Sequence, residues 1–456
     1  MRRDGYRGMA SRGVGPLSRR AALLLPLAAA GCTWFNDLFG EHKVALPGKR
    51  LPVLAAQRAL KVDNPPDRPV SLPRPEPLAN LLQAGGTPSH VGGHVAVRDT
   101  LAQAWSTSIG EGGGYRAKIT ARPVIDAGRV YAMDSTAVVS AFDVKGGSKL
   151  WSFDCSGGDD SSSNVGGGLA IGGGTLYAST GLATVFALDP NTGKQRWKGS
   201  LPTAARAAPT IADGLLYVPT LDDQLIALSA KDGSKAWSYQ AQAPDTPVLG
   251  LPSPAYADGL VVAGFGAGDL ICLRATSGAV TWTDNLSSIR GRVSMVDLAA
   301  IHGMPVIDES RVIATGLGGL LVSIDLRSGR RLWERDIASD QTPWVAGDWI
   351  FVLSTEQELA CFNRQDGAVA WVTQLPQWQD EKLLQGPIRW IGPALAGDRL
   401  IVAGSSDDAQ SALAVSPYTG RIIGQQDLSA PPSVPPVVAE GTVFIVTNDG
   451  DLLALR

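Results

Sequence analysis

The sequence has few of the residues that carry most enzyme chemistry. Among its 456 residues are four histidines and four cysteines, and no two of the cysteines are adjacent. The histidines stand in no evident Ser/His/Asp arrangement, so acid–base catalysis by histidine has little support. Beyond residue 30 the chain also lacks an amphipathic helical stripe of useful length. These absences argue against a helical domain and against a histidine-based active site.

The chain is instead rich in turn residues, and it repeats one phrase eight times. It contains 53 glycines and 30 prolines, with short β-branched and apolar runs between the turn signals. In each complete copy a small residue within an apolar run is followed by a turn glycine and, four residues later, by a tryptophan. Three copies are Ala187, Gly193 and Trp197; Ala227, Gly233 and Trp237; and Ser323, Gly329 and Trp333. Such repetition indicates repeated β-sheet units.

The repeat predicts a closed ring of sheets. Each unit reads as four strands separated by turns, and the spacing of the tryptophans suits propeller blades. The eighth copy is split: its three strands begin at Pro436 and end at Arg456, whereas a strand at 104–107 stands alone before the first complete copy. Pairing that N-terminal strand with the C-terminal blade closes the ring and leaves no open sheet edge at the seam. We therefore predict an all-β fold, an eight-bladed β-propeller of four-stranded antiparallel blades over residues 101–456. An open solenoid is the alternative, and it needs no split copy.

The small residues of the phrase form a column, which we place at a crowded face between neighbouring blades, where the sheets converge on the axis. The column comprises Ala141, Ala187, Ala227, Cys272, Ser323, Cys361, Ala414 and Ala454. Its two cysteines are interpreted as small buried packing residues, with a disulfide or metal pair as the alternative. The seventh copy has Gly424 where the others have tryptophan, so we expect this blade to pack more loosely.

The N-terminus is typical of a processing signal. Arg19 and Arg20 precede the apolar stretch 21–30, and small residues follow up to Cys32. The stretch is too short to span a bilayer. It resembles the lipobox of bacterial lipoproteins, which implies cleavage of residues 1–31 and attachment of lipid, such as palmitate, to Cys32. The export route, general or twin-arginine, stays open.

The next segment, residues 32–100, is predicted to be a tether. Nine prolines lie between Pro47 and Pro88, a composition typical of an extended and partly disordered linker. Loss of residues 1–31 removes six arginines and one aspartate from a chain of net charge −3, so the remainder is more acidic. An acidic surface argues against binding of nucleic acid and against adsorption on anionic lipids. Membrane contact is then expected through the lipid anchor only.

Three motifs suggest ligand sites, but structural explanations suit them better. His90 and His94 have a spacing that joins two imidazoles only on a helix, and the glycines between them disfavour a helix. The segment 448–451 resembles a calcium loop but lacks the full ligand series, and other copies have a hairpin turn there. No helix follows the glycine-rich stretch 157–174, which favours a flexible loop over a phosphate site. We predict no metal, no cofactor and no catalytic residue.

Tryptophan repeats of this kind resemble those of quinoprotein dehydrogenases. That resemblance would imply pyrroloquinoline quinone on the ring axis, a Ca²⁺, an aspartate base and adjacent cysteines below the cofactor. The chain has no adjacent cysteines and few long insertions that could build a pocket over the axis. A quinone-dependent periplasmic dehydrogenase is therefore kept as the alternative function.

The lipoprotein signal, the tether and the eight-copy propeller together resemble the BamB family, the lipoprotein propellers of the β-barrel assembly machinery. Residues 83–86, Gln-Ala-Gly-Gly, are similar to the segment that leads into the BamB propeller. The resemblance implies a non-enzymatic scaffold, anchored at the periplasmic face of the outer membrane. Its implied partners are the POTRA domains of BamA and other assembly subunits, with unfolded outer-membrane proteins as further candidates. It would assist folding and insertion of outer-membrane proteins.

In that family two neighbouring inter-blade loops contact BamA. The first keeps the family's leucines here, as Leu249 and Leu251, but not its arginine. The second contains Asp297, and Ala300 and His302 fall at the family's acidic positions. The resemblance thus makes Leu249, Leu251, Asp297 and His302 the partner-binding candidates. The alternative is that the leucines only cover a blade edge. A glycan or peptide ligand in the central channel would leave no signature that the sequence reveals.

Overall fold

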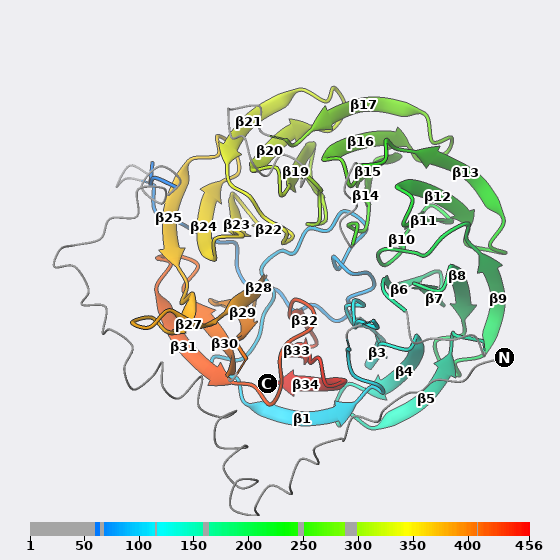
Figure 1. Cartoon of the computed structure of the whole chain (residues 1–456), viewed down its shortest axis with the longest axis horizontal. Coiled ribbons are helices and arrows are strands. Elements are labelled where there is room, and N and C mark those ends of the chain that lie inside the picture. The colour runs from blue at the N-terminus through cyan, green and yellow to red at the C-terminus, as the bar shows by residue number, and fades with distance from the viewer. Residues whose placement is uncertain are drawn as a thin grey trace, which may run out of the picture. The chain divides into compact units, whose positions relative to one another are not determined.

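The computed structural model describes residues 60–63, 68–114, 116–157, 164–244, 250–287, 299–407 and 409–456. The chain divides into two compact units, Met1–Ala59 and Leu60–Arg456, and all described residues belong to the second. In this unit the described strands form eight four-stranded sheets and one two-stranded hairpin. Figure 1 shows the eight sheets standing around a common axis. The predicted all-β, eight-bladed propeller is confirmed.

Each of the first seven blades takes four consecutive strands, which run from the axis outwards (Figure 1). The first blade is β2 (Val124–Asp126), β3 (Arg129–Met133), β4 (Val138–Asp143) and β5 (Lys149–Asp154), and the second is β6 (Gly167–Gly172), β7 (Thr175–Thr180), β8 (Thr184–Leu188) and β9 (Gln195–Ser200). The third is β10 (Thr210–Ala212), β11 (Leu215–Pro219), β12 (Gln224–Ser229) and β13 (Lys235–Gln240), and the fourth is β14 (Ala255–Ala257), β15 (Leu260–Gly264), β16 (Asp269–Arg274) and β17 (Val280–Asn285).

The remaining blades follow the same plan. The fifth is β18 (Val306–Asp308), β19 (Arg311–Thr315), β20 (Leu320–Asp325) and β21 (Arg331–Asp336), and the sixth is β22 (Trp344–Ala346), β23 (Trp349–Leu353), β24 (Glu358–Asn363) and β25 (Val369–Gln374). The hairpin β26 (Trp378–Asp380) and β27 (Gln385–Pro387) precedes the seventh blade, which is β28 (Arg389–Leu395), β29 (Leu400–Ser405), β30 (Gln410–Val415) and β31 (Ile422–Asp427). The eighth is β32 (Val437–Ala439), β33 (Thr442–Val446), β34 (Asp451–Leu455) and β1 (Gln103–Ser108).

Tight turns join the first two strands of most blades. In the third blade Asp213 and Gly214 have φ angles of 48° and 76°, and in the fourth Asp258 and Gly259 have 50° and 76°. Positive φ at both central residues is the mark of a type I′ turn, which needs glycine or a short polar residue. These turns match the right-handed twist of the flanking strands, so the Asp-Gly pairs fix the register of each inner hairpin.

The tryptophans join each blade to the next one. Ala227 on β12 lies directly opposite Trp237 on β13. The indole Nε1 of Trp237 donates to the carbonyl oxygen of Ala275 in the next blade, at 2.8 Å. The ring covers a turn glycine of that blade, because a Cβ added to Gly278 would lie 2.6 Å from Trp237 Cε3. Equivalent bonds are donated by Trp105, Trp151, Trp197, Trp282, Trp333 and Trp371.

The structure gives a different reason for the small residues of the column from the one that the sequence suggests. Each member lies on the third strand of its blade, next to the outermost strand rather than at the axis. Seven members face a tryptophan in the ladder and are buried. The column is therefore small because each position faces an indole across the ladder. Cys272 and Cys361 face Trp282 and Trp371, are buried and are unpaired, which confirms their packing role.

The missing tryptophan of the seventh blade matches a missing turn in the eighth. β1 pairs antiparallel with β34, with Trp105 opposite Ala454, so the eighth blade combines strands from two distant parts of the chain. This blade consequently has no turn between its third and fourth strands, and nothing there for an indole to cover. Gly424 faces Ala414, which is the one member of the column that is not fully buried. The neighbouring Ile423 is 55% exposed, in keeping with the looser packing expected.

Residues 76–97, here named the axial segment, are not the tether that the sequence indicates. They belong to the compact unit that begins at Leu60, and Figure 1 shows this part of the chain, in blue, crossing the middle of the ring. Leu81 and Val95 are 6% and 4% exposed and belong to the apolar core. The sequence suggested a linker because prolines are frequent between Pro47 and Pro88. Its order comes instead from contacts with the blades.

The axial segment bonds to all eight blades in turn. Glu440 of the eighth blade donates to Leu78, Leu81 exchanges two bonds with Ile125 of the first, and Ile171 of the second donates to Leu82. The Gln83 side chain bonds to Ile211 of the third blade. Tyr256, Ile307, Val345 and Gly397 continue the series through the fourth to seventh blades. Innermost strands would otherwise present unpaired backbone groups to the axis, and the segment satisfies one or more on each blade.

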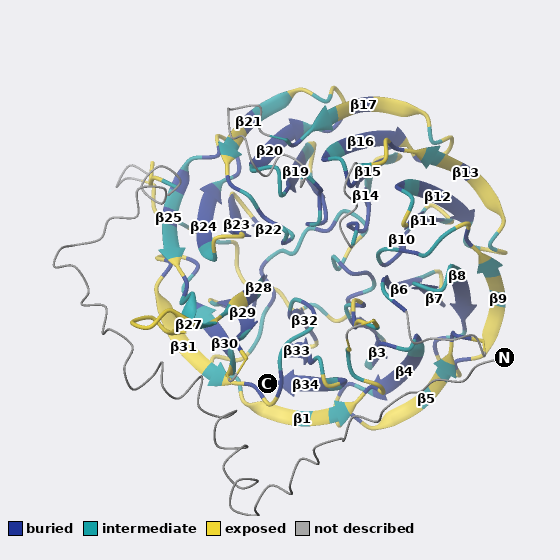
Figure 2. Cartoon of the chain, in the orientation of Figure 1, coloured by how far each residue is buried: buried dark blue, intermediate teal, exposed yellow. Residues whose placement is uncertain are grey.

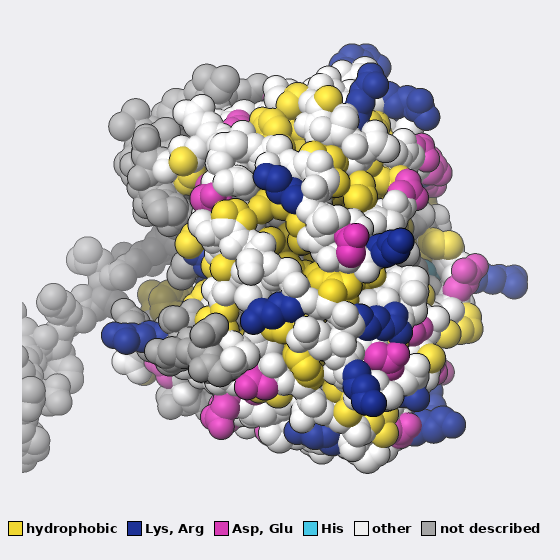
Figure 3. All heavy atoms as spheres, turned by 90° about the vertical axis from the view of Figure 1, so that its right-hand side faces the viewer, with side chains coloured by type: hydrophobic (Ala, Val, Ile, Leu, Met, Phe, Trp, Pro, Cys, Tyr) yellow, Lys and Arg dark blue, Asp and Glu magenta, His cyan; other side chains and the backbone are white. Residues whose placement is uncertain are grey.

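The apolar core lies mainly between adjacent blades, whose facing sheets bury aliphatic and aromatic side chains in successive clusters. In Figure 2 the inner strands are largely buried, whereas the outermost strands β5, β9 and β13 are largely exposed. Figure 3 shows acidic and basic side chains interspersed on the face it presents, without a field of one sign. This face offers no basic stripe of the kind that nucleic acids bind.

Candidate functional site

The two inter-blade loops singled out by the sequence lie side by side. One joins β13 to β14 and the other joins β17 to β18, so both are at the end of the ring where first strands begin. A Cβ added to Gly264 would lie 2.4 Å from Ile301 and 3.1 Å from Pro252, one residue from each loop. Likewise a Cβ at Gly250 would lie 3.9 Å from His302 Cε1. The described parts of the two loops therefore pack close to the same residue, Gly264 on β15.

Only part of the predicted partner site lies within the described residues. Leu249, Asp297 and Cys32 lie outside the described residues. Leu251 is 8% exposed, so its side chain belongs to the blade packing and is not the exposed apolar contact that the sequence suggested. The neighbouring Ile301 is fully buried, which shows how closely the two loops pack.

The surroundings of His302 favour its neutral form. Its Nε2 is sealed from solvent and has no hydrogen-bond partner among the described residues. Burial lowers the pKa of His302, and the nearby Asp340 opposes this effect only in part. A neutral imidazole at this position cannot replace the family's acidic side chain in an ion pair with a basic partner. His302 therefore contributes shape rather than charge to the loop surface.

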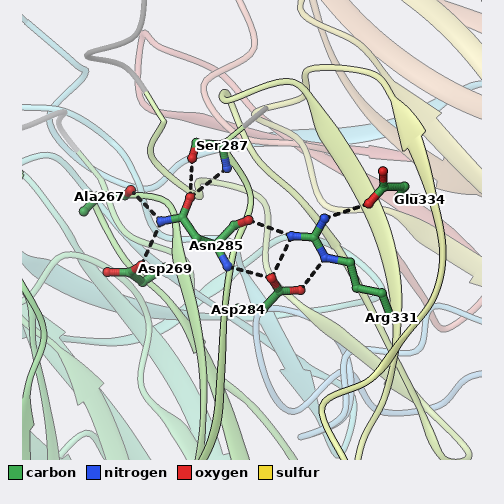
Figure 4. Close-up of polar contacts among 7 residues, drawn as sticks. All are labelled: Ala267, Asp269, Asp284, Asn285, Ser287, Arg331 and Glu334. Atoms are coloured by element: carbon green, nitrogen blue, oxygen red, sulfur yellow. Dashed lines mark hydrogen bonds and ion pairs between the residues drawn. The ribbon is translucent and has the colours of Figure 1, made fainter. Parts of the chain in front are cut away.

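A charged cluster that the sequence did not reveal fixes the base of the second loop. Arg331 on β21 reaches across to the end of β17, where its Nε and Nη2 each donate to a carboxylate oxygen of Asp284 at 2.7 Å (Figure 4). Nη2 also donates to the backbone oxygen of Asn285, and Nη1 to Glu334, again at 2.7 Å. Asp284 is the main cause that raises the pKa of Arg331. This bidentate pair links the fourth and fifth blades directly before the loop leaves β17.

Asn285 extends the cluster into the loop itself. Its Nδ2 donates to Asp269 at 2.8 Å, while its Oδ1 accepts the backbone N–H of Ser287 at 2.9 Å (Figure 4). The start of the loop is thus held from both blades. An Asp-Asn pair at a strand end is the signal available in the sequence, but the partner arginine lies far along the chain.

A cavity of about 80 Å³ opens on the axis at this same end of the ring. Its walls come from the axial segment and from residues just before inner strands, such as Met304 before β18 and Thr342 before β22. The lining is mainly apolar, with Leu81, Val91 and Trp344 among its members. Arg122 and His90 are the only residues of the lining that can carry charge.

The cavity does not fit a quinone cofactor with calcium. Its lining contains no aspartate, glutamate, asparagine or glutamine, so the side chains supply none of the carboxylate or amide oxygens that calcium requires. A volume of about 80 Å³ is also too small for the fused ring system of such a quinone. The axial segment itself occupies the centre of the ring. No reaction step through such a cofactor follows from these residues.

The other motifs have structural roles. The Nδ1 of His90 donates to the Pro305 carbonyl at 2.8 Å, and the two ring nitrogens of His94 contact the carbonyls of Pro73 and Gly397. The segment 448–451 forms the turn between β33 and β34. Within the described residues no group of three or more His, Cys, Asp or Glu side chains is placed to hold a metal ion. The described part of the chain also contains no helix long and apolar enough to cross a membrane.

Comparison with known proteins supports one family. The family model for the outer membrane protein assembly factor BamB matches residues 135–373 and 376–456. The assembly factor BamB of Yersinia pestis is 27% identical over 361 residues, which cover 77% of this chain and 87% of that protein. The BamB structure from Moraxella catarrhalis superimposes with a TM-score of 0.64 at 21% identity, covering 78% of this chain and all of that one.

The fold alone is shared more widely. A quinohemoprotein alcohol dehydrogenase from Pseudomonas putida superimposes with a TM-score of 0.65 at 13% identity, covering 83% of this chain and 80% of that one. Likeness of this degree shows a common propeller and carries no statement about chemistry. The distinction between scaffold and enzyme therefore depends on the site residues and on the family match.

Proposed function

Because this chain belongs to the family of the outer membrane protein assembly factor BamB, we propose that it is a non-enzymatic scaffold of the β-barrel assembly machinery. It works at the periplasmic face of the outer membrane and assists the folding and insertion of outer-membrane proteins. The observation that carries the proposal is the family match over most of the propeller. The absence of calcium ligands from the axial cavity agrees with a role without quinone chemistry.

The proposed partner is BamA, through its POTRA domains, together with other subunits of the machinery. The contact surface is the pair of inter-blade loops around Gly250 and His302, with Leu249 and Asp297 as the contributing side chains. Two features support this choice: the described parts of both loops pack close to Gly264, and the Arg331–Asp284 pair fixes the base of the second loop. A loop whose base is already fixed loses less conformational freedom on binding. Leu251 supports the surface from below because it is buried.

Attachment to the membrane is proposed to occur through lipid on Cys32 only. The basic residues and short apolar stretch before this cysteine support the proposal. Labelling cells with radioactive palmitate tests it: the wild-type protein should take up label, and the Cys32→Ala variant should not. Label retained by that variant would contradict the anchor.

The experiment that tests the function is direct binding of the purified protein to the POTRA fragment of BamA from the same organism. We expect Leu249→Ala to weaken this binding at least about tenfold, as is typical for the loss of an apolar contact at the centre of an interface. Leu383→Ala is the matched control, because Leu383 is 65% exposed on the β26–β27 hairpin, which belongs to neither loop.

Leu251→Ala should act differently. Because its side chain is buried, we expect a lower free energy of unfolding together with any change in affinity. Failure of the wild-type protein to bind the POTRA fragment would overturn the proposed function. Equal losses from Leu249→Ala and Leu383→Ala would instead reject these loops as the contact surface.

A further inference from the structure

Arg122 is a half-buried cation that lines the axial cavity, and it has no acidic partner among the residues that the structure describes. Within the described residues its side chain makes one hydrogen bond, which is long at 3.5 Å, from Nη2 to the hydroxyl of Thr342. That hydroxyl also accepts the backbone N–H of Met304 at 3.1 Å, so it is already shared. A guanidinium has five N–H donors, and buried arginines are normally paired. The donors of Arg122 are therefore largely unused in the described structure.

The surroundings of Arg122 are unfavourable to its charge. Burial lowers its pKa to about 10, and its positive field in turn helps to lower the pKa of His90. His90 is 3% exposed and its Nδ1 donates to the Pro305 carbonyl. His90 therefore supplies no negative charge to offset the charge of Arg122. Burying a charge costs free energy unless it is paired. An anion in the cavity would offset that cost.

The rest of the cavity is apolar. Leu81, Val91 and Val95 from the axial segment and Trp344 and Val437 from inner strands surround the space. A ligand that fits must therefore join a negative group to an apolar stem. The volume of about 80 Å³ admits a short aliphatic stem but no fused ring system. A carboxylate suits the guanidinium best, because the two groups can form a bidentate pair.

We propose that the axial cavity is a binding site for a carboxylate on a short apolar stem, which Arg122 holds at the ring axis. Two sources share this chemistry: a free short-chain carboxylic acid, and the C-terminal carboxylate of a polypeptide that ends in a small apolar residue. The cavity lies at the same end of the ring as the inter-blade loops. The site nevertheless stands independently of the proposed scaffold function, because its test needs no partner protein.

The test is isothermal titration of the purified protein with isobutyrate, compared with isobutyramide, which has the same shape and no charge. We expect isobutyrate to bind and isobutyramide to bind at least about tenfold more weakly, since a charge-assisted hydrogen bond is lost. Arg122→Met should reduce isobutyrate affinity by a similar factor. Arg116→Met is the matched control, because Arg116 is exposed and does not line the cavity.

Arg122→Met also carries its own control for folding. Methionine replaces a desolvated charge with an apolar chain of similar length, so we expect a melting temperature equal to or above that of the wild type. No binding of isobutyrate to the wild type would overturn the proposal. Equal binding of acid and amide, or equal affinity of wild type and Arg122→Met, would overturn it as well.

A second set of probes separates the two sources. Acetyl-glycyl-valine with a free carboxylate is compared with its C-terminal amide in competition against isobutyrate. Displacement by the acid alone supports a site that accepts a polypeptide terminus. Failure of both peptides to displace bound isobutyrate supports a site for free short-chain acids. Displacement by the amide as strongly as by the acid would contradict recognition of the carboxylate.

Discussion

At the scale of single residues, His90 links the stability of the fold to pH. Its ring is almost fully buried, and burial is the main cause that lowers its pKa from 6.5 to about 4, helped by Arg122 and opposed by the bond to Pro305. Because the folded-state pKa is the lower one, the unfolded chain takes up the proton first as the pH falls. The stability due to neutral His90 is therefore complete above about pH 6.5 and is lost as the pH falls towards 4.

His90→Asn should remove most of this dependence. The φ of His90 is 65°, a conformation that asparagine tolerates better than most residues, and the Asn amide can still donate to Pro305. Between pH 7 and pH 4 the wild type should lose about 3 kcal/mol more free energy of unfolding than the variant. Urea unfolding at a series of pH values measures the difference. His302 is present in both proteins, so its contribution to the pH dependence is the same in both. If the free energies of unfolding of the two proteins changed in parallel with pH, His90 would not be the source of the pH dependence.

At the scale of elements, the sequence predicted the strands but not how the blades lock together. The fixed spacing of the small residue, glycine and tryptophan within one copy identified the strands and the turn. It carried no information on which copies meet, and the structure shows that Gly278 packs under Trp237 of the preceding blade. The sequence could not explain Gly424 for the same reason. The seventh blade has glycine in place of tryptophan there because the eighth blade has no turn between its third and fourth strands.

The candidate site was predictable to a similar degree. Chain order placed the two loops on neighbouring blades, and in the structure Pro252 of one loop and Ile301 of the other both pack close to Gly264 on β15. The exposure of the loop side chains could not be predicted from chain order. Leu251 is buried through packing against other parts of the blade, which no local sequence pattern encodes. The Arg331–Asp284 pair was missed for the same reason, since its members lie on different blades.

Substitution of the turn glycine tests the lock between blades. Gly278→Ala would place a Cβ 2.6 Å from the ring of Trp237, whereas Gly259→Ala, in the same blade, would place it in open space. Both glycines have positive φ, 69° and 76°, so both variants carry about 1–2 kcal/mol of backbone strain. We expect Gly278→Ala to cost at least about 2 kcal/mol more, because overpacking is added to that strain.

Chemical denaturation of the two variants gives the comparison, and tryptophan fluorescence reports the displacement of the indole. If Gly278→Ala and Gly259→Ala were equally stable, the contact between the indole and the turn would not contribute to the coupling of the blades. Trp237→Phe complements the pair, since it keeps an aromatic ring but cannot donate to Ala275.

At the scale of the whole molecule, the axial segment changes how the ring is held together. A propeller is closed at its rim by the pairing of β1 with β34, as the split copy indicated. The structure adds a second closure at the axis, where the axial segment bonds to every blade. The sequence could not reveal this closure, because each of its contacts joins residues far apart in the chain. Proline content indicated an extended backbone correctly and said nothing of what that backbone contacts.

Truncation separates the two closures. A chain that begins at Leu60 keeps the whole described unit, whereas a chain that begins at residue 98 keeps β1 and the rim closure but loses the axial segment. The second chain loses the buried side chains of Leu81 and Val95 and leaves innermost strands with unpaired backbone groups. We expect its free energy of unfolding to fall by at least about 5 kcal/mol, from two apolar side chains and several hydrogen bonds. Calorimetry of both chains measures this loss, and isobutyrate titration should show binding only to the longer one. Equal melting temperatures would mean that the pairing of β1 with β34 is enough to hold the ring together. The axial segment would then fill the channel without contributing to the stability of the propeller.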